Sequence, residues 1–364
     1  MPRPIKNRYD LLRQNIAKFI FDGKSRQNKT FDIDNVKSIL FLRDDNKIGD
    51  MVVSTCLFRE IKIKYPNIKI SVLCGKDNKD IIGHNPNVDE IIELKYGFVE
   101  NIPLFISLGK RHFDLIADFL PLKPKPRYLA MLRLLKPEFL TGFYKKDYKI
   151  YTHSFEENLN DKHITKYYEL FLNFLGIKNP SLKYDVFLGS EEEVIKRGIG
   201  SKLQGKNIVL NIFAASKHRR LSIEKTEDLI LRIKQATKCN IFVLSHDEQT
   251  FQAVQPLEAY GATIFHSKSI LDTAALIKLC DLVISPDTAI VHIAAAFNKK
   301  LVALYLDYSD REEKTDIIWG PNYKNAAQIR LDRKNGALSN DIENIPNELI
   351  MSKVIDFLNQ SENK

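Results

Sequence analysis

The stretch Asp281–Tyr305, DLVISPDTAIVHIAAAFNKKLVALY, decides the fold that we expect for this chain. It begins with an apolar run, Leu282–Ile284, typical of a buried strand, and passes through a Ser-Pro-Asp-Thr turn into a helix with small residues on one face. A second apolar strand, Leu301–Tyr305, follows. Such a unit places unpaired backbone N–H groups and the positive end of a helix just beyond the carboxyl end of a strand, where phosphates bind. The stretch therefore predicts an anion-binding turn in an α/β fold.

Three polar side chains of this turn and helix are candidates for binding. Asp287, Thr288 and His292 can hold a ribose, a phosphate oxygen or a leaving group. His292 lies about one helical turn beyond Thr288 and therefore faces the same way. The alternative is an ordinary strand–helix crossover, in which Asp287 and Thr288 only cap the helix and His292 is a buried core residue.

The composition is that of a globular protein without a membrane span. The chain has 364 residues, of which 44% are hydrophobic and 28% charged, and its length favours two domains. No apolar run approaches the roughly 20 residues of a transmembrane helix, and the N-terminus lacks a signal-peptide pattern, so we expect a cytoplasmic protein. The cysteines lack C-x-x-C spacing and are expected to be reduced and mostly buried: Cys56, Cys74, Cys239 and Cys280.

The first thirty residues carry an excess of positive charge, within a formal net charge of +9 for the whole chain. Their apolar residues recur at helical spacing, which predicts an amphipathic helix with cationic flanks. Such a helix can lie on an anionic bilayer, where each basic residue contributes about 1 kcal/mol. The alternative is a helix docked on the protein body, with its charges solvated. The apolar positions are Tyr9, Leu12, Ile16, Phe19 and Ile20.

Beyond residue 35, apolar runs alternate with segments of helical periodicity, the pattern of an α/β fold with parallel sheets. Besides the opening stretch, strands are expected at Ile39–Leu42, Lys69–Leu73, Val88–Leu94, Asp114–Asp118, Asn207–Phe213 and Asn240–Leu244. Helices are expected at Met51–Lys64, Tyr128–Leu135, Lys166–Leu175, Ser222–Thr237, Leu271–Leu279 and Leu349–Leu358. The chain becomes polar and richer in Gly between about residues 178 and 206, where we expect the boundary between two domains.

Four segments, in order along the chain, resemble one known family. The segment Asp287–Ala296 reads D-T-A-x-x-H-x-A-A-A and resembles the donor-site signature of the ADP-heptose:lipopolysaccharide heptosyltransferases, glycosyltransferase family 9. That family usually has Gly where this chain has Ala289. Near the N-terminus, the strand SILFLR, the turn IGD, the helix and Tyr-Pro pair after it, and the strand ISVL resemble the family's opening. The other two landmarks are Asn85–Ile91 and His112–Ile116.

This resemblance implies a GT-B fold, in which two Rossmann-like α/β domains face each other across a cleft. On this basis we expect a basic amphipathic extension at 1–35, an acceptor-side domain at 36–185 and a nucleotide-sugar donor domain at 186–345. A C-terminal helix at 346–364 can cross back to the first domain, as in other GT-B folds.

The resemblance assigns Asp50 as the catalytic base. Glycosyl transfer needs a carboxylate within hydrogen-bond reach of the acceptor hydroxyl, and a Gly-Asp turn just past the first strand can present one to the cleft. The alternative is that Asp50 caps the helix that starts at Met51. Asp44 and Asp45 precede it but do not form the D-x-D metal site of the other glycosyltransferase architecture, and we interpret them as loop charges.

The segment Phe213–Arg220, FAASKHRR, follows the first strand of the second half, where the resemblance places the donor's diphosphate. Arg219 stands where the family commonly has Lys, and its guanidinium can bind phosphate oxygens bidentately and stabilise the departing ADP. Lys217 is the competing assignment, and the alternative for the whole segment is a solvated basic turn. Ser216 is a further candidate for a phosphate contact.

The rest of the expected donor site comes from two other strand ends. Asp247 falls where the family has a carboxylate near the ribose or adenosine, although its surroundings also suit an ordinary loop. Thr288 and the amides after it are expected to meet the diphosphate, which would remove any need for a metal or for a cofactor beyond the ADP-sugar. The full donor-binding set is Ser216, Arg219, Asp247, Asp287, Thr288, Ala289 and His292.

The resemblance therefore predicts an inverting, metal-independent glycosyltransferase that moves a heptose from ADP-heptose to the inner core of a lipopolysaccharide or lipooligosaccharide. The acceptor carries carboxylates and phosphates, which suit a basic segment with Lys123, Lys125 and Arg127; ordinary solvated charges are the alternative. We expect peripheral contact with the cytoplasmic face of the inner membrane.

Other functions remain open. The donor or acceptor can differ within the same fold, and a sugar-nucleotide epimerase shares the architecture but needs its own acid–base carboxylates and no second substrate. A non-enzymatic membrane-surface binding protein would use the basic N-terminal helix. Nucleic acid is not expected, because the basic segment lacks a helix-turn-helix or an aromatic RNA-binding motif. The G-x-S-x-G, G-x-G-x-x-G and P-loop motifs are absent, which argues against α/β-hydrolases, dinucleotide-fingerprint enzymes and P-loop NTPases.

Overall fold

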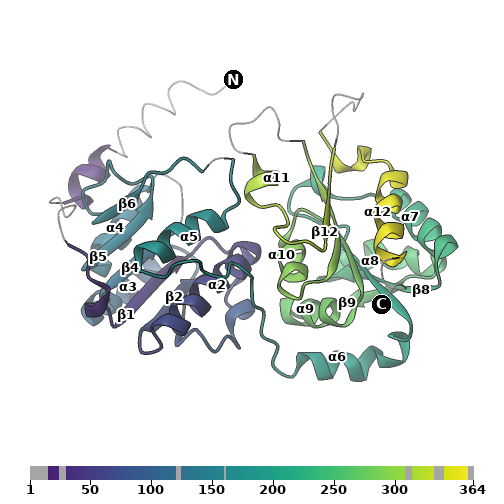
Figure 1. The fold of residues 1–364 in the computed structure, drawn as a ribbon, viewed down its shortest axis with the longest axis horizontal. Helices are drawn as coiled ribbons and strands as arrows, with labels where there is room; N and C mark the ends of the chain where they lie inside the picture. Colours follow the sequence, from purple (N-terminus) through teal and green to yellow (C-terminus); the bar gives the residue numbers. More distant parts are fainter. Residues whose placement is uncertain are drawn as a thin grey trace.

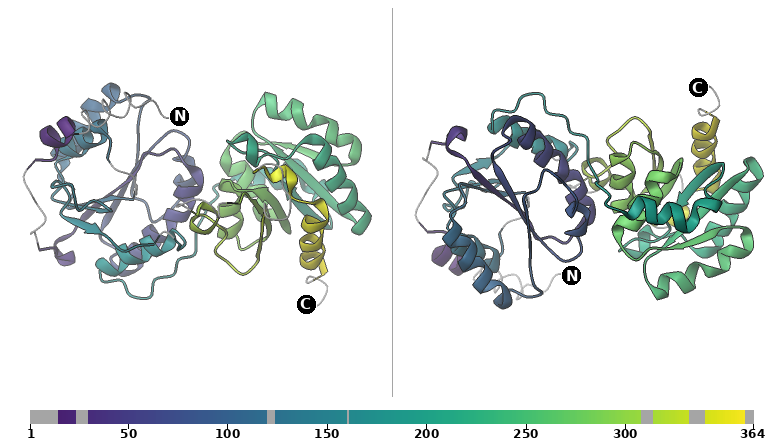
Figure 2. Two further views of the ribbon diagram at one scale, coloured as in Figure 1. Left: turned by 90° about the horizontal axis from the view of Figure 1, so that it is seen from above. Right: turned by 90° about the horizontal axis from the view of Figure 1, so that it is seen from below.

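The structure is a computed structural model that describes residues 15–23, 30–119, 124–159, 161–307, 314–331 and 340–359. Within this part of the chain, two six-stranded sheets with their covering helices form two α/β halves that lie side by side (Figure 1). Views from above and below show that the halves meet along one narrow zone (Figure 2).

The first half carries strands and helices in alternation. Its strands are β1 (Ser38–Arg43), β2 (Lys69–Cys74), β3 (Glu90–Glu93), β4 (Leu115–Asp118), β5 (Phe139–Phe143) and β6 (His153–Phe155). Its helices are α2 (Ile48–Lys64), α3 (Ile102–Arg111), α4 (Pro126–Leu135) and α5 (Thr165–Phe174), and residues 15–21 are also helical. Short 3-10 helices are η1 (Ile33–Asn35), η2 (Asp80–Ile82) and η3 (Val99–Asn101).

The second half repeats this alternation. Its strands are β7 (Lys206–Leu210), β8 (Cys239–Ser245), β9 (Thr263–His266), β10 (Leu282–Pro286), β11 (Lys300–Tyr305) and β12 (Ala326–Arg330). Its helices are α6 (Glu191–Ile199), α7 (Ile223–Ala236), α8 (Glu248–Val254), α9 (Ile270–Leu279), α10 (Ala289–Ala296), α11 (Thr315–Ile318) and α12 (Asn347–Asn359). Its 3-10 helices include η4 (Gly200–Lys202), η5 (Lys217–Arg219), η6 (Gln255–Tyr260) and η8 (Ile342–Asn344).

Both sheets are parallel and share one topology. The strand orders are β3-β2-β1-β4-β5-β6 and β12-β11-β10-β7-β8-β9. In each sheet the order reverses beside its first strand, between β1 and β4 and between β7 and β10, and ligands of such sheets bind outside the carboxyl ends at this reversal. The architecture confirms the expected fold of two Rossmann-like domains. The boundaries at residues 35, 185 and 345 remain predictions.

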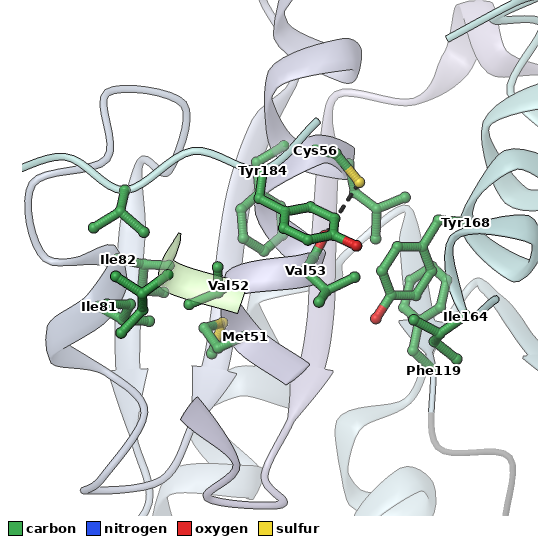
Figure 3. Close-up of a cluster of buried hydrophobic side chains, with 14 of the residues drawn as sticks. Met51, Val52, Val53, Cys56, Ile81, Ile82, Phe119, Ile164, Tyr168 and Tyr184 are labelled. Carbon is green, nitrogen blue, oxygen red and sulfur yellow. Dashed lines mark hydrogen bonds between the residues drawn. The ribbon is translucent and has the colours of Figure 1, made fainter. Parts of the chain in front are cut away.

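The helix α2 lies where the two halves meet. Every residue from Met51 to Phe58 is buried, which is the pattern of a helix packed on several sides. One side packs on the first sheet and another packs against α10, and a single hydrophobic cluster continues from α2 into the second half. Figure 3 shows Val52 near Ile81 and Ile82, with the Tyr184 ring beside Val53 and Cys56.

The segment that connects the halves is fastened to α2. Arg59 donates from Nη1 to the carbonyl of Lys183 at 2.8 Å and from Nη2 to the carbonyl of Ser181 at 2.7 Å, and it pairs with the Asp185 carboxylate. The backbone N–H of Asp185 donates to Thr55 Oγ1 at 2.8 Å. These bonds hold the connecting segment against α2, on the side of the helix that carries Thr55 and Arg59.

The C-terminal helix lies on the second half. The sequence left open that residues 346–364 cross back to the first domain, and in the described residues α12 packs within the second half, against α7 and β11. Asn347 Nδ2 donates to the carbonyl of Lys225 at 3.1 Å and to Asp228 Oδ2 at 2.8 Å. The apolar stripe of α12 fills the face of the second sheet, so its burial keeps the helix there.

Among the helices in the described ranges, none has both the length and the apolar character that crossing a bilayer requires.

Candidate active site

The turn after β1 brings Asp50 into the first turn of α2. Lys47, and not Asp50, is the N-cap residue of α2, so the capping alternative is not what the structure shows. The Asp50 side chain is 14% exposed, and its Oδ2 lies 3.4 Å from Arg43 Nη2 and 3.8 Å from Lys47 Nζ. A carboxylate at this position also faces the positive end of the helix.

Arg43, the last residue of β1, organises the carboxylates of this turn. Its guanidinium is 2% exposed, and its Nη2 lies 3.1 Å from Asp45 Oδ2. Burial raises the pKa of Asp50 to about 6, because the charged carboxylate loses hydration, while the Arg43 charge opposes the rise. A carboxylate with this pKa is ionised at neutral pH and still takes up a proton readily, as a general base must.

We expected Asp44 and Asp45 to be solvated loop charges, but both interact with charged groups around Asp50. Asp45 accepts hydrogen bonds from Arg43 and, at 3.3 Å, from the backbone N–H of Lys47, and so shapes the turn. Burial raises the pKa of Asp44 to about 6, and the nearby Asp118 carboxylate adds to the rise. The charges of both side chains therefore contribute to the electrostatic environment of Asp50 and its neighbours.

Sequence reasoning missed a buried polar group at the end of β4. Asp118 accepts from the hydroxyls of Tyr128 at 2.9 Å and Tyr151 at 2.5 Å. Lys145 is buried beside them; burial lowers its pKa, and the Asp118 charge opposes this. Leu42 of β1 pairs with Asp118. Because carboxyl ends of parallel strands meet at one edge, Asp118 at the end of one expected strand and Arg43 just after another were the available signal.

The turn between β10 and α10, residues 285–288, is where we expect the donor to bind, and we call it the donor turn. A threonine that caps α10 lies at its end. Thr288 is the N-cap residue of α10, and its Oγ1 accepts from the backbone N–H of Ile290 at 3.3 Å. Asn211, just after β7, donates from Nδ2 to Ser285 Oγ at 3.1 Å and to Thr288 Oγ1 at 3.2 Å. The Thr288 hydroxyl therefore caps the helix, as the alternative interpretation held. Its contact with a donor stays a prediction.

Arg219 and Asp287 form an ion pair at the start of this turn. Arg219 Nη1 lies 2.7 Å from Asp287 Oδ2 and 3.1 Å from the Asp287 carbonyl oxygen. Burial raises the pKa of Asp287, and Arg219 opposes the rise. Lys217, the competing candidate, begins the same short 3-10 helix and is exposed. The structure thus places Arg219, rather than Lys217, against the donor turn.

His292 lies at the contact between the halves. It is buried, and its ring meets those of Tyr184 and Trp319 edge-on, at centroid distances of 6.1 Å and 6.3 Å. Burial lowers its pKa to about 3, so the ring is neutral. A Cβ added to Gly49 would lie 2.8 Å from His292 Cδ2 and 3.4 Å from the Cα of Ala289. The residue before Asp50 therefore touches the first turns of α10.

Asp247 and Ser216 lie at the same sheet edge but serve local structure. Asp247 is the N-cap residue of α8 and accepts from the backbone N–H of Thr250 at 2.7 Å, which lowers its pKa. Its side chain is 53% exposed. Ser216 precedes η5, and its carbonyl accepts from Arg219 N at 3.0 Å. Donor contacts by either side chain remain predictions.

The predicted acceptor-binding residues follow β4, at the sheet edge where Asp50 also lies. Lys125 is the N-cap residue of α4, Arg127 is in its first turn, and both are exposed. Lys123 lies outside the described residues. No group of three or more His, Cys, Asp or Glu side chains that could hold a metal ion occurs in the described ranges.

Comparison with known proteins relates this chain to one family. The profile of "Glycosyltransferase family 9 (heptosyltransferase)" matches residues 110–342. A protein of Escherichia coli K12 named "Putative lipopolysaccharide heptosyltransferase 4" is 30% identical over 320 residues, which cover 86% of this chain and 87% of the relative.

Solved structures share the fold. The glycosyl transferase family 9 protein of Veillonella parvula superposes with a TM-score of 0.74 at 17% identity, covering 91% of this chain and 99% of that one. The ADP-heptose lps heptosyltransferase II of E. coli superposes with a TM-score of 0.71 at 17% identity, covering 89% and 99%. At such identities the likeness concerns the fold of both halves and their arrangement.

Proposed function

Since this chain belongs to glycosyltransferase family 9, the heptosyltransferases, it is a glycosyltransferase, and we propose that it moves a heptose from ADP-heptose to the core of a lipopolysaccharide or lipooligosaccharide. The observation that carries the proposal is the meeting of two turns, with Gly49 of the Asp50 turn against His292 and Ala289 of α10, which follows the donor turn. The names of the E. coli relative and of the E. coli structure supply the acceptor and donor classes.

The chemistry that we propose is a single displacement with inversion. Asp50 takes the proton of an acceptor hydroxyl while the acceptor oxygen attacks the anomeric carbon. The diphosphate leaves toward Arg219 and the first amides of α10, where a cation and a helix N-terminus stabilise its charge. In this proposal these groups replace a metal ion.

On the acceptor side, Lys125 and Arg127 are exposed at the sheet edge after β4, where they suit an acidic core saccharide. We include them as acceptor contacts, and Asp287, Thr288 and Asp247 as donor contacts.

Nucleotide binding tests the donor assignment. Without divalent metal, calorimetric titration should show ADP binding to the wild-type protein more tightly than UDP or GDP. Arg219→Ala should weaken ADP binding by roughly tenfold or more, the effect of losing a hydrogen bond between charged groups.

The matched control is Lys234→Ala, which changes an exposed lysine in the last turn of α7, at the opposite edge of the sheet, and should bind ADP as the wild type does. A preference for UDP or GDP would keep the glycosyltransferase fold but reject ADP-heptose as the donor. Absence of nucleotide binding would favour a binding protein.

The N-terminal helix supports a peripheral membrane contact at the cytoplasmic face of the inner membrane. The helix at residues 15–21 is held to the body of the first half by Asp22, which follows it. Asp22 Oδ1 accepts from the backbone N–H of Ile150 at 2.9 Å. On the opposite side Phe19 is 89% exposed, Ile20 57% and Ile16 50%. Tyr9 and Leu12, the other residues of the expected apolar face, lie outside the described residues.

Cationic side chains lie on this helix and near its end, where Arg133 Nη1 would be 3.2 Å from a Cβ added to Gly23. Lys18 Nζ lies 4.8 Å from the Tyr148 ring centroid, and a cavity of about 300 Å³ beside α4 is lined in part by Arg133 and Lys136. An apolar face with cationic flanks is what an anionic bilayer surface binds. If the helix were only docked on the protein body, its buried side would be explained, but the exposure of Phe19 would not.

Vesicle binding tests this contact. The full chain should sediment with vesicles rich in phosphatidylglycerol and not with phosphatidylcholine vesicles. Phe19→Glu should weaken that binding by roughly tenfold or more, since burying a phenylalanine side chain contributes roughly 1.5–3 kcal/mol. Leu231→Glu changes an exposed leucine of α7 and should have no effect. Equal binding of Phe19→Glu and wild type would reject the contact.

A further inference from the structure

Lys47 has a fixed backbone and an exposed side chain at the centre of the site. Its N–H donates to Asp45 Oδ1 at 3.3 Å, and its carbonyl accepts from the N–H of Met51 at 3.1 Å. The side chain is 65% exposed, and its Nζ lies 3.8 Å from Asp50 Oδ2. An exposed ion pair of this length contributes little to stability, so folding does not explain the presence of this lysine.

Lys47 lies at the place where the two halves touch. Gly49, two residues further along, contacts His292 and Ala289, so the start of α2 faces the start of α10. Burial raises the pKa of both Asp50 and Asp287, and the Lys47 charge opposes the rise in each. The lysine therefore acts on one carboxylate from each half.

In the second half, the cation that lies against the donor turn is already paired with a carboxylate. Arg219 is ion-paired with Asp287 at 2.7 Å, so this pair brings little net charge to the turn. As the sugar departs, negative charge grows on the diphosphate, and a preorganised cation stabilises that charge best. Among the described residues that touch the Asp50 turn, Lys47 is the exposed cation whose charge reaches Asp287.

We propose that Lys47 is a catalytic residue that the first half contributes to the donor site, with its ammonium against an oxygen of the nucleotide-sugar diphosphate. This inference rests on the proposed function. A bond forms between the acceptor oxygen and the anomeric carbon, and the bond from that carbon to the diphosphate breaks. The electron pair stays on the diphosphate oxygen beside Lys47, and the acceptor proton moves to Asp50. Lys47 neither gains nor loses a proton.

Calorimetry with ADP and with adenosine isolates a phosphate contact. Lys47→Met should weaken ADP binding by about tenfold and leave adenosine binding unchanged, because only ADP presents the diphosphate. Lys47→Arg should retain most of the ADP affinity, since it keeps the charge. Lys64→Met is the matched control: it removes one exposed lysine from the other end of the same helix and should bind ADP as the wild type does.

The outcomes separate this inference from the proposed function. If Arg219→Ala weakens ADP binding and Lys47→Met does not, the donor site stands and the role of Lys47 is rejected. Equal losses for ADP and adenosine would also reject it, because they indicate a general distortion. A shift in the pH profile of transfer without a change in ADP affinity would mean that Lys47 only tunes Asp50. A wild-type protein that binds no ADP would overturn both proposals.

Discussion

Replacing Asp50 with Asn is expected to lower the rate of sugar transfer by a factor of roughly 10²–10⁴, the usual contribution of a general base. The amide has the shape of the carboxylate but cannot accept the proton of the acceptor hydroxyl. ADP affinity should change little, because in our proposal the diphosphate contacts come from other residues. Steady-state transfer kinetics and calorimetry on the same preparations measure both quantities.

The pH dependence of the transfer rate of the wild-type enzyme is a second test of the role of Asp50. Burial raises the pKa of Asp50 to about 6, so the carboxylate becomes protonated as the pH falls through that value. Transfer should therefore be constant at neutral pH and fall about tenfold for each pH unit well below 6. Three charged neighbours modify this effect of burial on the pKa: Arg43 and Lys47 oppose the rise, and Asp45 adds to it.

A control variant separates the base from general effects of charge removal. Asp356→Asn changes an exposed carboxylate on α12 and should leave the rate and the pH profile unchanged. If Asp50→Asn kept more than a third of the wild-type rate, Asp50 would not be the base, and the neighbouring Asp44 would become the candidate.

The second large effect is expected from Gly49→Ala. The added Cβ would lie 2.8 Å from His292 Cδ2, closer than side-chain carbons approach, and His292 is a buried ring without room to yield. The start of α2 must then move away from α10, and Asp50 moves with it. A displacement of about 1 Å between reacting groups costs on the order of 10²-fold in rate, so we expect a loss of that size.

Gly198→Ala in α6 is the matched control, because a Cβ there meets nothing within 4 Å. Alanine favours a helix more than glycine does, so this variant should be as active as the wild type and slightly more stable. Transfer rates and thermal unfolding of both variants measure the effect. A fully active Gly49→Ala would show that the contact between the two halves does not position Asp50.

Much of the fold could be predicted from the sequence because the strands are apolar runs and their parallel pairing leaves little choice of topology. The expected strand Ile39–Leu42 lies within β1, and the donor strand and helix are as expected. The sequence did not decide which half the C-terminal helix packs against. Its apolar periodicity predicts that one face is buried, but periodicity does not say against which sheet.

The candidate site could be predicted only in part, because its electrostatics depend on side chains that are distant in the sequence. The motif around Asp50 identifies the turn, but the register that places Asp118 beside β1 is a property of the sheet. The proximity of Gly49 to His292 likewise depends on how the two halves pack. A motif predicts a residue's type and local position, and tertiary packing decides which charges act on it.

The most direct test of the central claim is to incubate the wild-type protein with ADP-heptose and a lipooligosaccharide lacking core heptose, and to weigh the lipid product by mass spectrometry. Our account predicts a product heavier by one heptose residue, with one ADP released for each transfer. The same acceptor gaining no heptose from ADP-heptose, while gaining a sugar from another nucleotide donor, would contradict it.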